Sequence, residues 1–339
     1  MRKRKMWSAR QILCLVLSAV LLLQSGFIVL ADDEEEETEP AKSQPGEVYA
    51  YDAENIYKEG FFVPTQVYQF GGEFFIADAY NHQILHTNDV NNAPGGWNPV
   101  GMGLNRPHAI ASDGTIYLVI DTDNNRVVTY TKTEVGYQLV ESIENVGIRP
   151  HYTVYDKATG QFYVWSSMTG TMYIYKRAKN GLTLKLKSTR TIKDLNGAYT
   201  RSFTMDKNTI YFPSVGKSAI YAVNKSNFKV KAVYPVAPEL GEMVQLLHIQ
   251  NYYYLVTSAD AAKEKEPMIV RSKTLAGFGN GQYENIRDMF GELDGIPYYI
   301  TQGEDGHFYT PVIEGTCHSY ICSFDIEKDV IKNVNHLKY

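Results

Sequence analysis

The tripeptide Arg-Pro-His occurs twice in the sequence, as residues 106–108 and again as residues 149–151. Arginine can bind a carboxylate or a phosphate through two parallel hydrogen bonds, and histidine can bind a metal ion or exchange a proton near neutral pH. The proline between them fixes one backbone dihedral and is typical of a turn that leads into a strand. The two motifs therefore indicate either a ligand site or a repeated turn, and the elements around them must decide between the two.

Short strand-like segments fill the sequence from residue 61 onward. They are rich in Tyr, Val, Ile and Phe and are separated by turn signals such as Asp-Gly, Thr-Gly and Asn-Gly. No stretch of a dozen residues in this part of the sequence carries an apolar stripe at helical spacing. The chain is therefore predicted to be all-β.

These segments recur with a regular period. One aromatic residue in each expected second strand can be aligned at intervals of 43 to 55 residues, namely Phe74, Tyr117, Tyr163, Tyr211, Tyr254 and Tyr309. A period of about 40 to 50 residues with several strands per unit is typical of a β-propeller. We predict six blades of four antiparallel strands, with five or seven blades as alternatives. We expect a long loop within residues 263–293 and a ring-closing strand within residues 46–57.

Two of the units resemble the NHL repeat, whose pattern runs apolar-apolar-Ala-Asp-Thr-x-Asn-x-Arg-Ile. The matching residues are Asp78, Asn81 and Ile84 in the first unit, and Asp121, Thr122, Asn124, Arg126 and Val127 in the second. Gln83 replaces the Arg of the pattern, the third unit keeps only its outline, and later units lack the Asp and Asn. The chain is thus similar to six-bladed NHL-type propellers, which include amidoglycolate lyase-like and gluconolactonase-like proteins. The resemblance implies the fold, and this fold hosts many activities.

The propeller arrangement places both Arg-Pro-His motifs at one end of the central channel. Each motif would enter an innermost strand, Asp113-Gly114 would turn at the far end, and the 121–125 turn would return to the first face. We predict a ligand-binding mouth formed by Thr65, Arg106, His108, Arg149, His151, Arg201, Gln245 and Tyr298. Ser202 is expected at the equivalent mouth position of the fourth unit, with Gln66, Tyr199, Met243 and Tyr299 beside the mouth. The alternative is that Pro makes the turn and that Arg pairs with an Asp of the preceding blade.

The resemblance also raises the possibility of an enzyme. Amidoglycolate lyases hold zinc through three channel histidines, whereas this chain offers only His108 and His151 at matching positions. Lactonase-type propellers bind a divalent ion through Glu, Asn and Asp, and only Glu59 matches. The 121–125 run begins like a calcium loop but lacks its Gly and distal Glu, so Asp121 and Asn124 are expected to bond backbone and tie adjacent blades. We therefore expect no cofactor and favour a binding module, with a metal-assisted lyase or hydrolase as the alternative.

The N-terminal region predicts export. Residues 1–31 combine a basic start with an apolar run and Ala31, as in a secretory signal peptide, and an uncleaved anchor is the alternative. Residues 32–46 are expected to be an acidic disordered spacer, and residues 47–339 the propeller. Loss of the five basic residues of the leader leaves 28 basic and 38 acidic residues, a net charge of −10, which argues against nucleic-acid binding.

A secreted or cell-surface propeller would meet a small molecule, a carbohydrate or a protein partner at its mouth. Export also permits a disulfide between Cys317 and Cys322, which are close in sequence, although two free thiols are the alternative.

Overall fold

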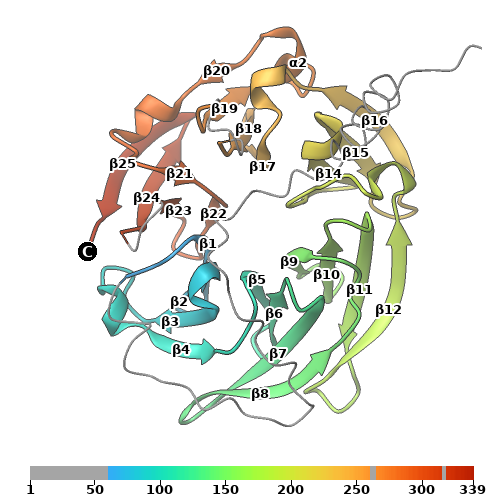
Figure 1. Cartoon of the computed structure of the whole chain (residues 1–339), viewed down its shortest axis with the longest axis vertical. Coiled ribbons are helices and arrows are strands. Elements are labelled where there is room, and N and C mark those ends of the chain that lie inside the picture. Colours follow the sequence, from blue (N-terminus) through green and yellow to red (C-terminus); the bar gives the residue numbers. More distant parts are fainter. Residues whose placement is uncertain (1–59, 260–264, 315–317) are drawn as a thin grey trace, which may run out of the picture. The chain divides into compact units, whose positions relative to one another are not determined.

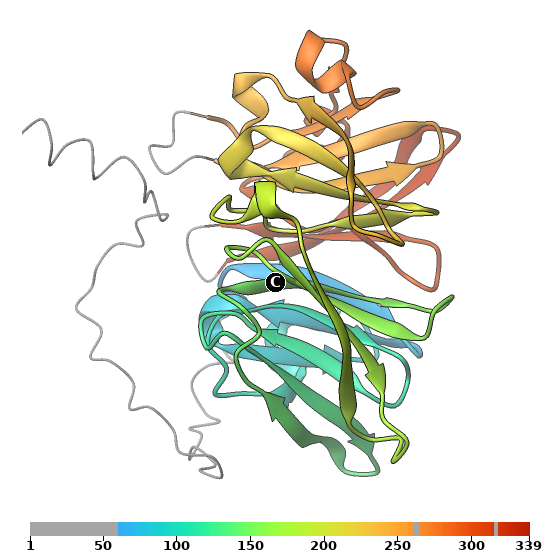
Figure 2. The same ribbon diagram turned by 90° about the vertical axis from the view of Figure 1, so that its right-hand side faces the viewer.

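The computed structural model describes residues 60–259, 265–314 and 318–339. Within these ranges, six antiparallel sheets stand around a common axis, so the predicted six-bladed β-propeller is confirmed (Figure 1). We call the space enclosed by the innermost strands the channel, and the end at which these strands begin its upper mouth. In the perpendicular view the strands run between the two faces of the ring (Figure 2).

The first three blades are regular four-stranded meanders. Their strands are β1 (Pro64–Phe70), β2 (Glu73–Asp78), β3 (Gln83–Thr87) and β4 (Asn98–Gly101); β5 (Pro107–Ser112), β6 (Tyr117–Asp121), β7 (Arg126–Thr133) and β8 (Gly136–Ile143); and β9 (Pro150–Asp156), β10 (Gln161–Ser166), β11 (Thr171–Arg177) and β12 (Leu184–Thr191). In each blade the first strand lies nearest the axis and the fourth lies at the periphery (Figure 1).

The other three blades are less regular. Their strands are β13 (Thr204–Asp206), β14 (Thr209–Ser214), β15 (Ala219–Asn224) and β16 (Val230–Pro235); β17 (Met243–Ile249), β18 (Tyr252–Thr257), β19 (Ile269–Ser272) and β20 (Glu284–Asn285); and β21 (Ile296–Pro297), β22 (Thr301–Gln302), β23 (Phe308–Ile313), β24 (Tyr320–Glu327) and β25 (Val330–Leu337). In the sixth blade the innermost position is divided, because β21 and β22 both pair with β23.

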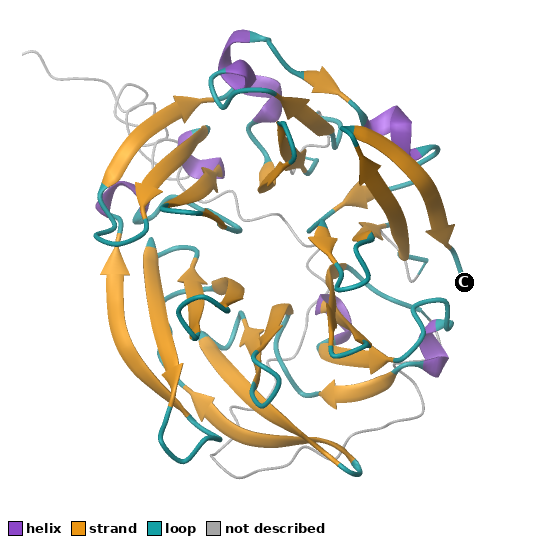
Figure 3. Ribbon diagram, turned by 180° about the vertical axis from the view of Figure 1, so that it is seen from behind, coloured by secondary structure: helices purple, strands orange, loops and turns teal. Residues whose placement is uncertain are grey.

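Helices are short in the described part of the chain (Figure 3). They are η1 (Ala79–Asn81), η2 (Pro94–Gly96), η3 (Lys193–Leu195), η4 (Val215–Lys217), η5 (Pro238–Leu240), α2 (Gly277–Asn280) and η6 (Arg287–Phe290). Residues 265–293, where a long loop was predicted, contain the short elements β19, α2, β20 and η6, which are separated by loop segments. Two of these are the short outer strands of the fifth blade, which carry too few residues to show an alternating pattern.

The second strands carry the strongest sequence signal because they are buried on both faces between neighbouring blades. Every residue of β2, β6, β10 and β14 is buried. Strands buried on both sides read as continuous apolar and aromatic runs rather than as alternating ones. The six aromatic residues aligned from the sequence all lie in second strands or, in the sixth blade, in β23. The outermost strand β12, by contrast, is mostly exposed.

The ring closes through contacts between the first and last blades. The backbone N–H of Tyr299 donates to the Thr65 carbonyl, and the hydroxyl of the C-terminal Tyr339 donates to the carbonyl of Val90 at 2.9 Å. The ring of Tyr339 also packs edge-on against Phe61 of the first blade. Residues 46–57, for which a ring-closing strand was predicted, lie outside the described residues.

The leader, the acidic spacer, Glu59 and Cys317 also lie outside the described residues. Cys322 is buried within β24. Among the residues that the structure describes, no helix is long and apolar enough to span a membrane.

Candidate functional site

The residue before each of the first three innermost strands has a left-handed backbone. Val63, Arg106 and Arg149 have φ of 53°, 49° and 53°, and each precedes the proline that begins β1, β5 or β9. A left-handed residue costs about 1–2 kcal/mol unless it is a glycine, so the surrounding contacts must hold it. The N–H of Arg149 donates to Asn125 Oδ1 at 2.8 Å, and the N–H of Arg106 faces His82 Nδ1 at 3.4 Å. The Arg-Pro-His motif thus recurs in the first place because both copies form the same turn.

Asp121 fixes this turn from within its own blade. Its Oδ1 accepts the backbone N–H of Asn105 at 2.6 Å, while Oδ2 accepts Asn124 Nδ2 at 2.9 Å and Arg126 Nε at 2.6 Å. The prediction that Asp121 and Asn124 bond backbone and turn residues is therefore confirmed for Asp121. The prediction that they tie adjacent blades was wrong, because all these partners belong to the second blade, and Asn125 makes the contact to the third.

The first and third blades build the same clamp with different residues. Asp78 accepts the N–H of Phe62, Nδ2 of Asn81 and Nε2 of Gln83 at 2.8 to 2.9 Å, so Gln83 takes the place that Arg126 has in the second blade. In the third blade, Ser166 Oγ accepts the N–H of Ile148 at 2.9 Å. The side-chain acceptor that holds this turn is therefore kept in the first and third blades, although other residues build it.

His108 and His151 come together at the upper mouth, with ring centroids 4.0 Å apart. His108 Nδ1 lies 2.7 Å from the Arg106 carbonyl oxygen and 3.0 Å from Thr122 Oγ1. A carbonyl oxygen only accepts, so Nδ1 carries the proton and Nε2 of the neutral ring keeps its lone pair. No hydrogen bond joins this Nε2 to another of the residues described.

His151 belongs to a chain of hydrogen bonds that crosses the channel. Tyr299 donates its hydroxyl proton to the Arg201 carbonyl at 3.1 Å, so its oxygen accepts from His151 Nδ1 at 2.8 Å. His151 Nε2 is then free to accept from the Tyr199 hydroxyl at 3.1 Å. Every donor in this chain meets an acceptor when His151 is neutral, so the network satisfies a residue that is fully buried.

Two of the three predicted arginines share one carboxylate. Arg106 Nη1 and Arg149 Nε lie 3.4 Å from different oxygens of Asp123, and the two side chains remain 26% and 31% exposed. Arg106 also lies over the ring of Tyr80, 4.8 Å from its centroid. The Arg149 contact is an ion pair without the geometry of a hydrogen bond, because Nε has no hydrogen-bond partner. Asp123 belongs to the second blade, so this contact joins Arg149 to the preceding blade and Arg106 to its own blade.

Arg201 has a structural position. Its side chain is 2% exposed, its Nη1 donates to the Met243 carbonyl at 3.0 Å, and its Nη2 lies 3.7 Å from Glu242 Oε2. The guanidinium also lies over the Tyr199 ring, 4.9 Å from the centroid. Arg201 therefore ties the fourth blade to the fifth and contributes positive charge to the mouth from below the surface.

The electrostatic field at the mouth is positive, although the whole chain is acidic. Burial lowers the pKa of His108, the hydrogen bond to the Arg106 carbonyl opposes this, and the charges of Arg149, Arg106 and Arg201 add to it, so that the pKa is about 3. Burial, the neighbouring His108 and the charges of Arg149 and Arg201 also hold the pKa of His151 well below its usual range. Both imidazoles are therefore neutral at physiological pH.

The remaining predicted residues lie on or below the mouth. Thr65 donates its hydroxyl to the His108 carbonyl at 2.9 Å and so joins the first blade to the second. Tyr298 is buried beside Tyr299, with ring centroids 4.7 Å apart. Gln245 lies lower, where its amide exchanges two hydrogen bonds with the backbone of Ile300.

The structure also involves two residues that were not predicted as site residues. Thr122 contacts His108, and Asp123 pairs with both exposed arginines. The only signal for them in the sequence was the expectation that the 121–125 turn shares a face with the Arg-Pro-His motifs.

The histidines do not fit the three-ligand metal site of the lyases. Both nitrogens of His151 are engaged with tyrosine hydroxyls, which leaves His108 Nε2 as the available lone pair. Within residues 60–259, 265–314 and 318–339, no group of three or more His, Cys, Asp or Glu side chains is placed to hold a metal ion.

Comparison with known proteins shows similarity in structure only. No protein-family model and no curated protein matches the sequence. Among solved structures, a "putative 6-phosphogluconolactonase" from Bacteroides uniformis is 10% identical, with a TM-score of 0.55 over 80% of this chain and 84% of its own. Hydrazine synthase from Kuenenia stuttgartiensis is 16% identical, with a TM-score of 0.53 over 84% of this chain and 81% of its own. At these identities the likeness shows a common fold, the β-propeller that the strand pairing defines.

Proposed function

We propose that this protein is a binding module whose upper mouth holds a small hydroxylated anion. The observation that carries the proposal is the unprotonated Nε2 of His108, without a hydrogen-bond partner among the described residues, in the field of three arginines. A neutral imidazole nitrogen accepts a hydrogen bond from a ligand hydroxyl, and guanidinium groups bind an anionic group.

The partly exposed arginines support the anionic character of the ligand. Arg106 and Arg149 share Asp123, so one carboxylate faces two guanidinium groups. Both contacts are 3.4 Å long, which is longer than a charge-assisted hydrogen bond of about 2.7–2.9 Å. A ligand carboxylate or phosphate can therefore approach Arg149 without first breaking a short hydrogen bond between its Nε and Asp123.

The half-buried Tyr199 adds an aromatic side chain to the imidazole and guanidinium groups of the proposed site. Its hydroxyl donates to His151, and its ring lies beside the Arg201 guanidinium. Hydrogen bonds hold the tyrosine in place before a ligand arrives, which limits the entropy lost on binding.

The proposal can be tested by isothermal titration with D-gluconate, a hydroxylated carboxylate suggested by the name of the Bacteroides uniformis neighbour. Gluconate should bind, its affinity should fall as salt is added, and the uncharged analogue D-sorbitol should not compete. R149Q should weaken binding about tenfold, as expected for the loss of one charge-assisted contact. R177Q is the matched control, since Arg177 pairs with Asp113 between blades, away from the mouth. Equal affinities for R149Q and R177Q, or no binding of gluconate, would contradict the proposal.

The metal-assisted lyase or hydrolase has less support, because the residues present do not complete a three-ligand site. Elemental analysis of the purified protein separates the two functions. A stoichiometric divalent ion that is lost in H108A would favour the enzyme over the binding module.

A further inference from the structure

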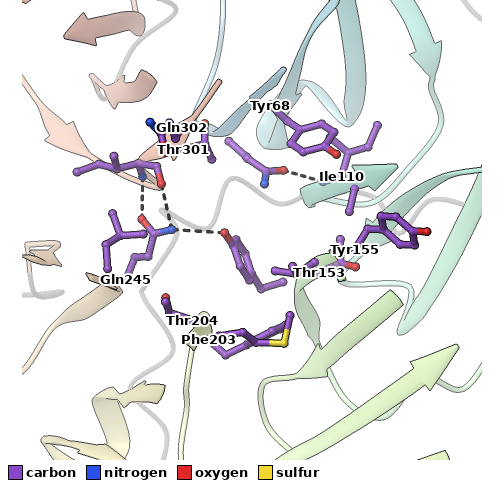
Figure 4. Close-up of a pocket in the computed structure, with 16 residues that line it drawn as sticks. Tyr68, Ile110, Thr153, Tyr155, Phe203, Thr204, Gln245, Thr301 and Gln302 are labelled. Carbon is purple, nitrogen blue, oxygen red and sulfur yellow. Dashed lines mark hydrogen bonds between the residues drawn. The ribbon is translucent and has the colours of Figure 1, made fainter. Parts of the chain in front are cut away.

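A second candidate site lies in the lower half of the channel, beneath the histidines. A cavity of about 260 Å³ is lined there by residues of the innermost strands of all six blades. Of the eight residues predicted for the mouth, only Gln245 borders it. Figure 4 shows labelled side chains from different blades around this space, including Thr153, Phe203 and Gln302. The cavity is therefore separate from the proposed anion site, and the inference below does not depend on that site.

The cavity has a buried base and an open rim. Gln66, Tyr152, Phe203 and Gln245 at the base are all buried. Gln302 at the rim is exposed, and the neighbouring rim residues are half-buried. A small molecule can therefore enter from the lower face and reach the buried base. The volume is far larger than the share of one water, about 30 Å³, and below the usual range of drug-sized pockets, about 300–1,000 Å³.

Thr153 gives the base an unused polar group. Thr153 borders the cavity and is 2% exposed, and its Oγ1 is buried without a hydrogen-bond partner among the described residues. The other polar groups nearby are already engaged, since Gln245 bonds to Ile300 and to the Tyr152 hydroxyl (Figure 4). Buried hydroxyls normally have a partner, because leaving one unsatisfied costs about 1–3 kcal/mol. A ligand at the base would provide the missing partner once the Thr153 hydroxyl turns toward the cavity.

The lining residues define the class of ligand. They comprise amides, hydroxyls, aromatic rings and aliphatic side chains, and none of the described residues that border the cavity is Asp, Glu, Lys, Arg or His. An ionised ligand would lose its hydration here without gaining a counter-charge, so a charged molecule is disfavoured. Aromatic rings and amides together suit a molecule with both C–H faces and hydroxyl groups. We propose that the lower channel binds one neutral polyhydroxylated molecule of monosaccharide size.

Saturation-transfer NMR with D-glucose, D-galactose and glycerol tests this proposal on the purified protein. At least one of the three should receive saturation, whereas glucose 6-phosphate and glucuronate should not compete with it. T153V removes the hydroxyl and keeps the shape, so binding should weaken about tenfold. T129V is the matched control, because Thr129 Oγ1 is also buried without a partner but does not line the cavity.

A second variant tests the position of the ligand. Ala111 borders the cavity, and A111L should abolish sugar binding by occupying part of the space. R149Q should leave sugar binding unchanged, so a failure at the upper mouth can be told apart from a failure here. Saturation transfer to none of the three probes, equal binding by T153V and T129V, or a crystal structure with only water in the cavity at high sugar concentration would each overturn the proposal.

Discussion

The imidazole of His151 and the phenol of Tyr299 meet across the channel, with Nδ1 and the hydroxyl oxygen 2.8 Å apart. The two residues are 148 positions apart in the sequence and come from the third and sixth blades. The Tyr299 hydroxyl also donates a hydrogen bond to the Arg201 carbonyl of the fourth blade, so one hydroxyl joins three blades. This contact fixes the tautomer of His151 and the floor of the upper mouth.

Removing that hydroxyl should therefore lower the free energy of unfolding more than removing a hydroxyl that has no protein partner. Y299F leaves His151 Nδ1–H and the Arg201 carbonyl without their buried partner, so we expect a loss of about 1–3 kcal/mol in the free energy of unfolding. Urea denaturation measures it. Y163F is the control, since Tyr163 is 5% exposed in a second strand and its hydroxyl bonds to none of the other described residues. Similar losses in the two variants would argue that the cross-channel contact contributes nothing specific.

His108 should make the protein sensitive to acid. Its pKa falls to about 3 on folding because burial, together with three nearby arginines, disfavours the imidazolium. The unfolded chain then binds more protons than the native state from about pH 6.5 downward, so stability is lost as the pH falls. H108N keeps a donor to the Arg106 carbonyl and does not titrate. Between pH 6.5 and pH 4 the wild type should lose on the order of 3 kcal/mol more than H108N, measured by urea titration at each pH. Parallel pH profiles would contradict this prediction.

Asp78 should make the protein less stable as the pH rises, which is opposite to the effect of His108. Burial raises its pKa to about 7 against three hydrogen-bond donors. A raised folded pKa means that the native state holds the proton longer, so stability present below about pH 4 is lost as the pH rises toward 7. D78N should show a shallower decline in melting temperature over this range. A decline as steep as that of the wild type would mean that the clamp carboxylate is already ionised at low pH.

Asp123 should compete with the proposed ligand. It is the carboxylate shared by Arg106 and Arg149, so D123N removes one negative charge that faces both guanidinium groups. We expect gluconate to bind several-fold more tightly to D123N at low salt, while D113N, which unpairs Arg177, leaves the affinity unchanged. Titration calorimetry measures both. Weaker binding by D123N would show that Asp123 positions the arginines rather than competing for them.

The repeat could be predicted because each second strand is buried on both faces and keeps an aromatic residue at a fixed place. Tyr117 and Tyr163, for example, occupy equivalent places in β6 and β10. Turn chemistry then placed Arg106 and Arg149 on the face where the strands begin. The hydrogen bonds of Asp121 to its turn could be predicted because all its partners lie within about 16 residues of it in the sequence.

The cross-channel contacts could not be predicted from local pattern. Tyr299 reaches His151 only because the sixth blade divides its innermost strand, and no local signal marks that interruption. The burial of Arg201 depends on Glu242 and Met243 of the next blade. The unpartnered hydroxyl of Thr153 likewise has no signature, because a threonine in a strand is ordinary whether or not its oxygen finds a partner.

The state of His108 Nε2 tests the central claim most directly. ¹⁵N NMR of histidine-labelled protein at neutral pH should show His108 and His151 both neutral, each with its proton on Nδ1. On addition of D-gluconate, the account predicts that the Nε2 resonance of His108 shifts with the binding isotherm, while that of His151, held by Tyr199, stays nearly fixed. Gluconate binding that leaves the His108 Nε2 resonance unmoved, or a protonated Nε2 in the free protein, would contradict it.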